Sequence, residues 1–172
     1  MYRVLLADDE QIERMALAKR LKRHFCGSLD ISEAVNGAEA LETFKREKSQ
    51  IVVMDISMPE MNGVEAAERI RSLDEDCIII FLTAYDEFSY AKRAIVIRAL
   101  DYLLKPCEED ELVAVMEEAM RLTDKRLSVS GVPSPGVPSP DIRREEHAEA
   151  MPRDDGDGRL AQVAETIREY IR

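Results

Sequence analysis

Along the first 124 residues, short apolar runs rich in β-branched residues alternate with longer segments whose apolar positions recur every three or four residues. The short runs are typical of buried strands, and the longer spacing is typical of helices that cover a sheet. The pattern predicts strands over residues 4–7, 30–35, 51–54, 77–82 and 101–104. It predicts helices over 11–25, after 36, from 63 to about 72, from 86 or 89, and from about 108.

Capping and turn residues indicate where two helices start, and the spacing of apolar residues indicates the buried faces of two others. Asn36 stands three residues before Glu39, which is the spacing of a capping box, and Asn62-Gly63 marks the loop before the third helix. We expect the first and last helices to turn apolar stripes towards the sheet. These stripes are Ile12, Met15, Ala18, Leu21 and Phe25 in the first helix, and Leu112, Val115, Met116, Ala119 and Leu122 in the last.

Five strands alternating with five helices predict an α/β fold, a doubly wound parallel sheet with helices on both faces. Right-handed crossovers leave few arrangements, and the flavodoxin-like (βα)5 fold has strand order 2-1-3-4-5. In that order the first and third strands lie side by side at the point where such sheets bind ligands.

The composition changes after residue 124. Within 125–158, the sequence Gly-Val-Pro-Ser-Pro at 131–135 is repeated at 136–140, and a mixed-charge stretch follows. Such a segment buries no core, and we expect a flexible linker. Over 159–172 an amphipathic helical pattern returns, but one isolated helix of this length is marginal without a partner.

Composition limits the classes of function. The chain has 172 residues and a net charge of −11, which argues against direct nucleic-acid binding because phosphate contacts need clustered Lys and Arg. Its three cysteines are not spaced as metal ligands and are expected to be reduced in a cytoplasmic protein. The sequence shows neither a signal peptide nor an apolar run of the roughly 18 residues that a membrane helix needs.

Polar residues stand where four of the predicted strands end. Asp8-Asp9 follows the first strand, Asp55 the third, Thr83 the fourth and Lys105 the fifth. Three clustered carboxylates repel one another, so such a pocket favours a divalent cation, and oxygen ligands suit Mg²⁺ or Mn²⁺.

Each residue type has a role in phosphoryl chemistry. We expect Asp55 to be the nucleophile that forms an aspartyl-phosphate, and Asp8, Asp9, Asp55 and the backbone carbonyl of Ser57 to hold the metal. Lys105 would place a positive charge by the phosphoryl oxygens, and Thr83 would offer a hydroxyl donor.

Each of these residues alone has an ordinary structural explanation. An acidic pair before a helix often caps that helix. An Asp before a Pro/Gly loop, or a Thr after a strand, usually stabilises a turn. Lys-Pro before an acidic helix start is a common junction. A functional site is favoured because all of these residue types occur together, in the expected order, at the ends of four strands.

The chain resembles the receiver domain of bacterial two-component response regulators over residues 1 to about 124. The matching segments are Val-Leu-Leu-Ala-Asp-Asp-Glu at 4–10, Met-Asp-Ile-Ser-Met-Pro-Glu-Met-Asn-Gly at 54–63, Leu-Thr-Ala at 82–84 and Asp-Tyr-Leu-Leu-Lys-Pro at 101–106. The resemblance implies that a sensor histidine kinase phosphorylates Asp55 with Mg²⁺ present. It also implies that Thr83 moves towards the phosphoryl group and Tyr102 turns inward. The face of the fourth helix, fifth strand and fifth helix would then change, with homodimerisation, and the Lys105-Pro106 bond is commonly cis in this family.

Residues 85–91 and 99–106 are similar to those of regulators that carry an AraC-type DNA-binding domain, and 159–172 resembles the first helix of that domain. Because the sequence stops at Arg172, two helix-turn-helix units do not fit. We expect either truncation before an output domain that would contact DNA, or a stand-alone receiver that acts through protein–protein contacts.

Two other classes of function compete with the switch. A phosphatase that uses an aspartyl-phosphate usually has a second Asp two residues after the nucleophile, whereas Ile56-Ser57 follows Asp55 here. A degenerate receiver that acts only as a scaffold would lack Asp55, Lys105 or the acidic pair. We therefore expect a phosphoacceptor and not an enzyme, with at most self-phosphorylation from small donors and slow autodephosphorylation.

Overall fold

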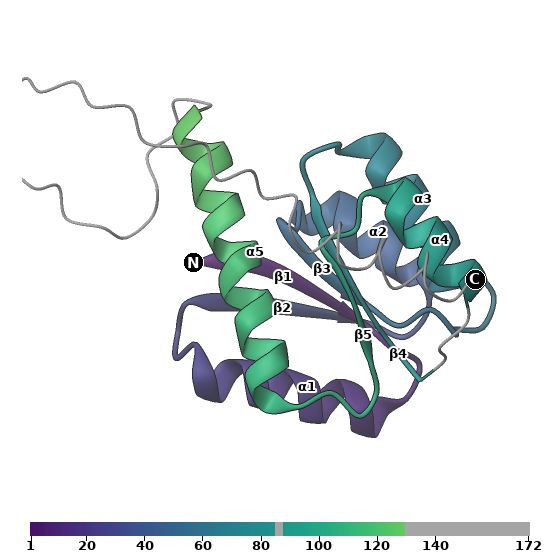
Figure 1. The fold of residues 1–172 in the computed structure, drawn as a ribbon, viewed down its shortest axis with the longest axis horizontal. Coiled ribbons are helices and arrows are strands. Elements are labelled where there is room, and N and C mark those ends of the chain that lie inside the picture. The colour runs from purple at the N-terminus through teal and green to yellow at the C-terminus, as the bar shows by residue number, and fades with distance from the viewer. Residues whose placement is uncertain (85–87, 130–172) are drawn as a thin grey trace, which may run out of the picture.

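The computed structural model describes residues 1–84 and 88–129, which form a five-stranded parallel sheet with helices on both faces (Figure 1). The strands are β1 (Tyr2–Ala7), β2 (Leu29–Ala34), β3 (Ile51–Met54), β4 (Ile78–Thr83) and β5 (Asp101–Leu104). The helices are α1 (Gln11–His24), α2 (Gly37–Glu47), α3 (Gly63–Leu73), α4 (Phe88–Ile97) and α5 (Glu109–Val129). The predicted helix at 159–172 and most of the predicted linker lie outside the described residues.

The strand order is β2-β1-β3-β4-β5, which confirms the predicted flavodoxin-like topology. All neighbouring strands are parallel, and the last paired residues of β1 and β3 are Ala7 and Met54. The residues that follow these two strands are therefore adjacent at the carboxyl edge of the sheet.

Side-chain alternation divides the core into two layers. Odd positions of β1, such as Leu5, pack with α2, α3 and α4, and even positions, such as Leu6, pack with α1 and α5. Figure 1 shows α1 and α5 on one side of the sheet and the other three helices on the opposite side. The central strands β3 and β4 are fully buried, which explains why they are continuous apolar runs and not alternating ones.

The predicted sheet-facing stripe of α1 is wrong in its first half. Ile12 and Met15 are 83% and 58% exposed, and the buried positions of the helix are Arg14, Leu17, Ala18 and Leu21. These four residues recur at i, i+3, i+4 and i+7, so the buried stripe starts from a charged residue that hydropathy alone does not select.

Several boundaries differ from the predicted ones by a few residues. Strand β1 starts at Tyr2, β4 shifts by one position to end at Thr83, and α4 starts at Phe88, between the two predicted starts. Helix α5 continues to Val129, past residue 124. Within residues 1–84 and 88–129, none of the helices combines the length and apolar character needed to span a membrane.

Candidate functional site

Acidic residues gather where β1 and β3 end. The N–H of Asp8 donates to Ala34 O at 3.1 Å, and the N–H of Asp55 donates to Ala7 O at 2.8 Å, so both residues extend the ladder of the sheet. This backbone pairing aligns their side chains at the carboxyl edge. Asp8, Asp9 and Asp55 each offer a carboxylate oxygen, and these atoms all lie within 4.8 Å of one another. Asp8 and Asp55 are buried, whereas Asp9 is exposed.

Lys105 follows β5 and brings an ammonium group into this pocket. Its Nζ lies 2.7 Å from Asp8 Oδ2, 2.7 Å from Asp55 Oδ2 and 2.6 Å from Glu13 Oε2. The Lys105-Pro106 peptide bond is cis, as the family resemblance implied. The structure thus brings together the acidic pair, Asp55 and Lys105, which lie far apart in the sequence.

Burial and charge act in opposite directions on these groups. Burial raises the pKa of Asp8, and the charge of Asp55 adds to this effect, although hydrogen bonds from Lys105 and the N–H of Glu10 oppose it. Burial alone would lower the pKa of Lys105, but its hydrogen bonds to Asp55, Asp8 and Glu13 raise it above its usual value. Lys105 is therefore cationic at neutral pH, in a pocket that remains rich in negative charge.

The loop between β3 and α3 holds Asp55 in place. The N–H of Ser57 donates to Asp55 Oδ1 at 3.1 Å, and the N–H of Gly63 donates to Ile56 O at 2.9 Å. Asn62 caps α3 by accepting from the N–H of Glu65 at 2.9 Å. A Cβ at position 63 would overlap the carbonyl oxygen of Asp55, so only glycine allows this close approach.

Thr83 and Tyr102 lie on the same face of the sheet. Thr83 is fully buried at the end of β4, two residues after Phe81, which belongs to the core under α2, α3 and α4. Tyr102 is partly buried, pairs in register with Phe81 and packs against the same core. The carbonyl of Thr83 also accepts from the N–H of Lys105 at 2.8 Å, which links the ends of β4 and β5.

Sequence reasoning missed two residues of α1 at this site. Arg14 donates from Nη1 to Asp8 O at 2.6 Å and from Nε to Glu33 Oε2 at 2.9 Å, so it supports the end of β1. Glu13 contacts Lys105. Arg14 has a detectable signal, because it shares the helical spacing of Leu17, Ala18 and Leu21. Glu13 has none, since an acidic residue in a first turn is explained by the helix dipole.

Comparison with known proteins places this geometry in context. The family model described as the response regulator receiver domain matches residues 4–117. The chain is 36% identical over 118 residues to YesN of Bacillus subtilis, described as a transcriptional regulatory protein, covering 69% of this chain and 32% of YesN. It is 34% identical over 131 residues to the transcriptional regulatory protein HptR of Staphylococcus aureus, covering 76% of this chain and 51% of HptR.

A solved structure agrees with the fold. The REC domain of AraT, a response regulator from Geobacillus stearothermophilus, superposes with a TM-score of 0.62 at 34% identity, covering 75% of this chain and 98% of that domain. The chain spans about half or less of the length of these curated relatives, whereas it covers nearly all of the isolated AraT domain. The similarity therefore lies in one domain that the relatives share.

Proposed function

This chain belongs to the response regulator receiver domain family, and we propose that it is a phosphorylation switch in which Asp55 accepts a phosphoryl group from a sensor histidine kinase. The observation that carries the proposal is the contact of Asp55 Oδ2 with Lys105 Nζ, beside the carboxylates of Asp8 and Asp9. A nucleophilic carboxylate, a fixed cation and further oxygen ligands are the parts that phosphoryl transfer requires.

The residues present suit a magnesium ion. Three carboxylate oxygens converge within 4.8 Å, and hard oxygen donors that leave room for water match the preference of Mg²⁺, or of Mn²⁺. We propose that Asp8, Asp9, Asp55 and the backbone carbonyl of Ser57 hold the ion. When bound, it would offset the negative charge of the carboxylates and of an incoming phosphoryl group.

The transfer itself uses the side chains of the chain. A carboxylate oxygen of Asp55 attacks the phosphorus of the donor, and a new P–O bond forms. The bond from phosphorus to the donor, a histidine nitrogen of the kinase or the acyl oxygen of acetyl phosphate, breaks, and its electron pair leaves with the donor. Lys105, held by Asp8 and Asp55, places positive charge beside the oxygens of the group in transfer.

The output follows from the shared face of the sheet. We propose that Thr83 moves towards the phosphoryl group and that Tyr102 turns inward, since both lie on the α4 side of the sheet at neighbouring strands. The face of α4, β5 and α5 would then change and form a homodimer. The names of YesN and HptR support a transcriptional output, which would reach DNA through a further domain, AraC-type by the resemblance.

Intact mass tests the switch directly. The wild-type chain is incubated with acetyl phosphate and Mg²⁺, and the Asp55→Asn variant and a matched variant of an exposed strand residue, Asp30→Asn, are treated alike. We expect one added phosphoryl group on the wild type and on Asp30→Asn, and none on Asp55→Asn or after chelation of the metal. Labelling that persists in Asp55→Asn would refute the assignment of the acceptor. Continuous release of phosphate without a labelled intermediate would favour an enzyme.

A further inference from the structure

Lys105 is surrounded by three carboxylates of unequal exposure. Its Nζ contacts Asp8, Asp55 and Glu13 at 2.7, 2.7 and 2.6 Å. The side chains of Asp8 and Asp55 are 5% and 8% exposed, whereas that of Glu13, in the first turn of α1, is 42% exposed. An ammonium group has three N–H donors, so these three contacts use all of its hydrogen-bonding capacity.

A phosphoryl group on Asp55 adds further negatively charged oxygens, so it would need a donor beyond the one that Asp55 already accepts from Lys105. The need for this donor rests on the proposed function, in which Lys105 reaches the phosphoryl oxygens. Asp8 is a poor group to release, since its side chain is buried and water cannot replace the hydrogen bond that it would lose. Glu13 lies at the surface, where water replaces the lost contact at little cost. The phosphoryl group therefore competes with Glu13 for an N–H of Lys105.

The surroundings of Glu13 give its side chain room to leave. Glu13 and Lys105 line the same open cavity of about 370 Å³ between α1 and the segment after β5. Leu17, Pro106 and Cys107 also line this cavity. A carboxylate displaced from Lys105 can rotate into this space without moving the backbone of α1.

We propose that Glu13 is a positioning residue that occupies the third N–H of Lys105 in the unphosphorylated protein and is displaced when Asp55 is phosphorylated. Glu13 thereby slows phosphoryl uptake and lowers the phosphorylated fraction at a given donor concentration. The residue acts through Lys105 and touches neither the acceptor nor the transferred group.

Two substitutions separate the contact from the charge. Glu13→Gln keeps the length of the side chain and removes its charge, whereas Glu13→Asp keeps the charge and shortens the reach to Lys105. Glu10→Gln is the matched control, since Glu10 is an exposed acid just before α1 and is not among the carboxylates within 4.0 Å of Lys105 Nζ in the described residues. The rate of mass gain from acetyl phosphate with Mg²⁺ is measured for each variant.

We expect both Glu13 variants to take up the phosphoryl group roughly two- to fivefold faster than the wild type, the range that an ion pair of this exposure supports. Glu10→Gln should match the wild type. Equal acceleration by Glu10→Gln, or acceleration by Glu13→Gln alone, would assign the effect to long-range charge and overturn the proposal. Unchanged rates in both Glu13 variants would overturn it as well.

A second measurement needs no phosphoryl donor. Thermal unfolding without Mg²⁺ is compared for the wild type, Glu13→Gln, Lys105→Met and the double variant, and a direct contact requires that the two single effects are not additive. Additive effects would overturn the inference while leaving the proposed function intact. Absence of labelling on wild-type Asp55 would instead remove the proposed function, and this inference with it.

Discussion

Because the start of α3 lies against the backbone of Asp55, we expect Gly63→Ala to lose both stability and phosphorylation. An added Cβ would overlap the carbonyl oxygen of Asp55, and it would lie 2.9 Å from the carbonyl carbon of Asp55 and 3.0 Å from Ile56 Cα. Ordinary contacts of a Cβ begin at 3.4 Å. All three obstructing atoms belong to the backbone, so no side chain can move aside to relieve the overlap.

The substitution must therefore separate the start of α3 from the residue that carries the acceptor. The hydrogen bond from Gly63 N–H to Ile56 O, 2.9 Å long, closes the loop at this point and would be stretched. We expect a loss of stability of about 1–3 kcal/mol, the usual cost of forcing a methyl group into a packed site. A displacement of Asp55 by ~1 Å would reduce the rate of phosphorylation by ~100-fold.

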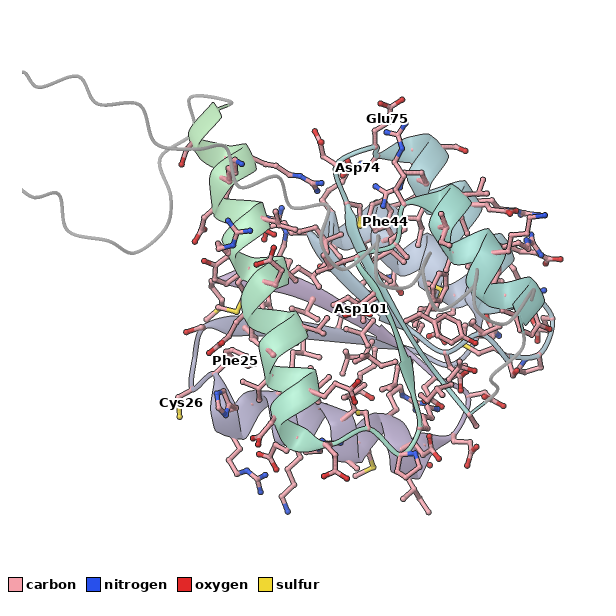
Figure 2. The ribbon with its side chains drawn as sticks, viewed as in Figure 1. Phe25, Cys26, Phe44, Asp74, Glu75 and Asp101 are labelled. Carbon is pink, nitrogen blue, oxygen red and sulfur yellow. The ribbon has the colours of Figure 1, made fainter. Side chains whose placement is uncertain are left out.

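Gly27→Ala is the matched control, since it also replaces a glycine but far from the site. Gly27 has φ of 75°, and an added Cβ there would meet no atom within 4 Å. Its cost is backbone strain of about 1–2 kcal/mol. The next residue, Ser28, accepts from the N–H of Tyr2 at the amino edge of the sheet, and Figure 2 shows Cys26 beyond the end of α1.

Urea unfolding and intact-mass labelling are measured for both glycine variants with acetyl phosphate and Mg²⁺. We expect both to lose stability and only Gly63→Ala to lose labelling. Normal labelling of a folded Gly63→Ala protein would refute the claim that this contact holds Asp55 in place. Equal loss of labelling in Gly27→Ala would show that global destabilisation causes the defect.

Three further predictions concern pH, a partly buried hydroxyl and a guanidinium. The folded state raises the pKa of Asp8 above 3.8, so the protonated carboxyl stabilises the fold below that pH, and this stabilisation is lost as the pH rises through the raised pKa. Without Mg²⁺, Asp8→Asn should flatten this pH dependence and raise the melting temperature at neutral pH, as thermal scans from about pH 4 to 8 would show. Tyr2 donates to Asp124 at 2.7 Å, so Tyr2→Phe should cost about 0.5–1.5 kcal/mol in urea unfolding. Since the pKa of Tyr2 is raised from 10.0 to about 12, the difference should be full below pH 10.0 and decline as the pH rises through about 12, and a pH-independent difference would contradict this account. Arg71 donates to backbone carbonyls at the end of α4 and in the α3–β4 turn, where Figure 2 labels Asp74 and Glu75. Arg71→Ala should lower the free energy of unfolding in urea by about 2–3 kcal/mol. An equal loss in Arg69→Ala, which changes an exposed residue of the same helix, would refute a specific role of Arg71.

Periodicity and strand-end residues were enough to predict the topology and to name the residues that meet at the carboxyl edge. The reason is that parallel order places the ends of β1 and β3 together whatever the details of the loops. Asp8 and Asp55 follow these strands directly, so their positions need no knowledge of side-chain conformation. Lys105 follows β5, and its long side chain reaches across the end of β4.

The two site residues that hydropathy missed are charged, and their roles depend on the direction in which each side chain points. Arg14 replaces an apolar residue in the buried stripe of α1 because the carbonyl of Asp8 and the carboxylate of Glu33 lie there to receive it. Glu13, its neighbour, contacts Lys105 although its side chain is partly exposed. Sequence spacing does not encode these partners, since Asp8 follows β1, Glu33 lies in β2 and Lys105 follows β5, and only the fold brings these strands together.

The backbone and side chain of Lys105 connect the acceptor to the residue proposed to switch. Its Nζ lies 2.7 Å from Asp55, and its N–H donates to Thr83 O at 2.8 Å. Any change in the partners of the ammonium therefore acts on a residue whose backbone is bonded to the end of β4. Because Thr83 is fully buried, its side chain can move only if the packing on the α4 side of the sheet also moves. We expect the exchange of Lys105 partners and the shift of Thr83 to be one concerted step, so that labelling and the change of the α4–β5–α5 face share a single rate.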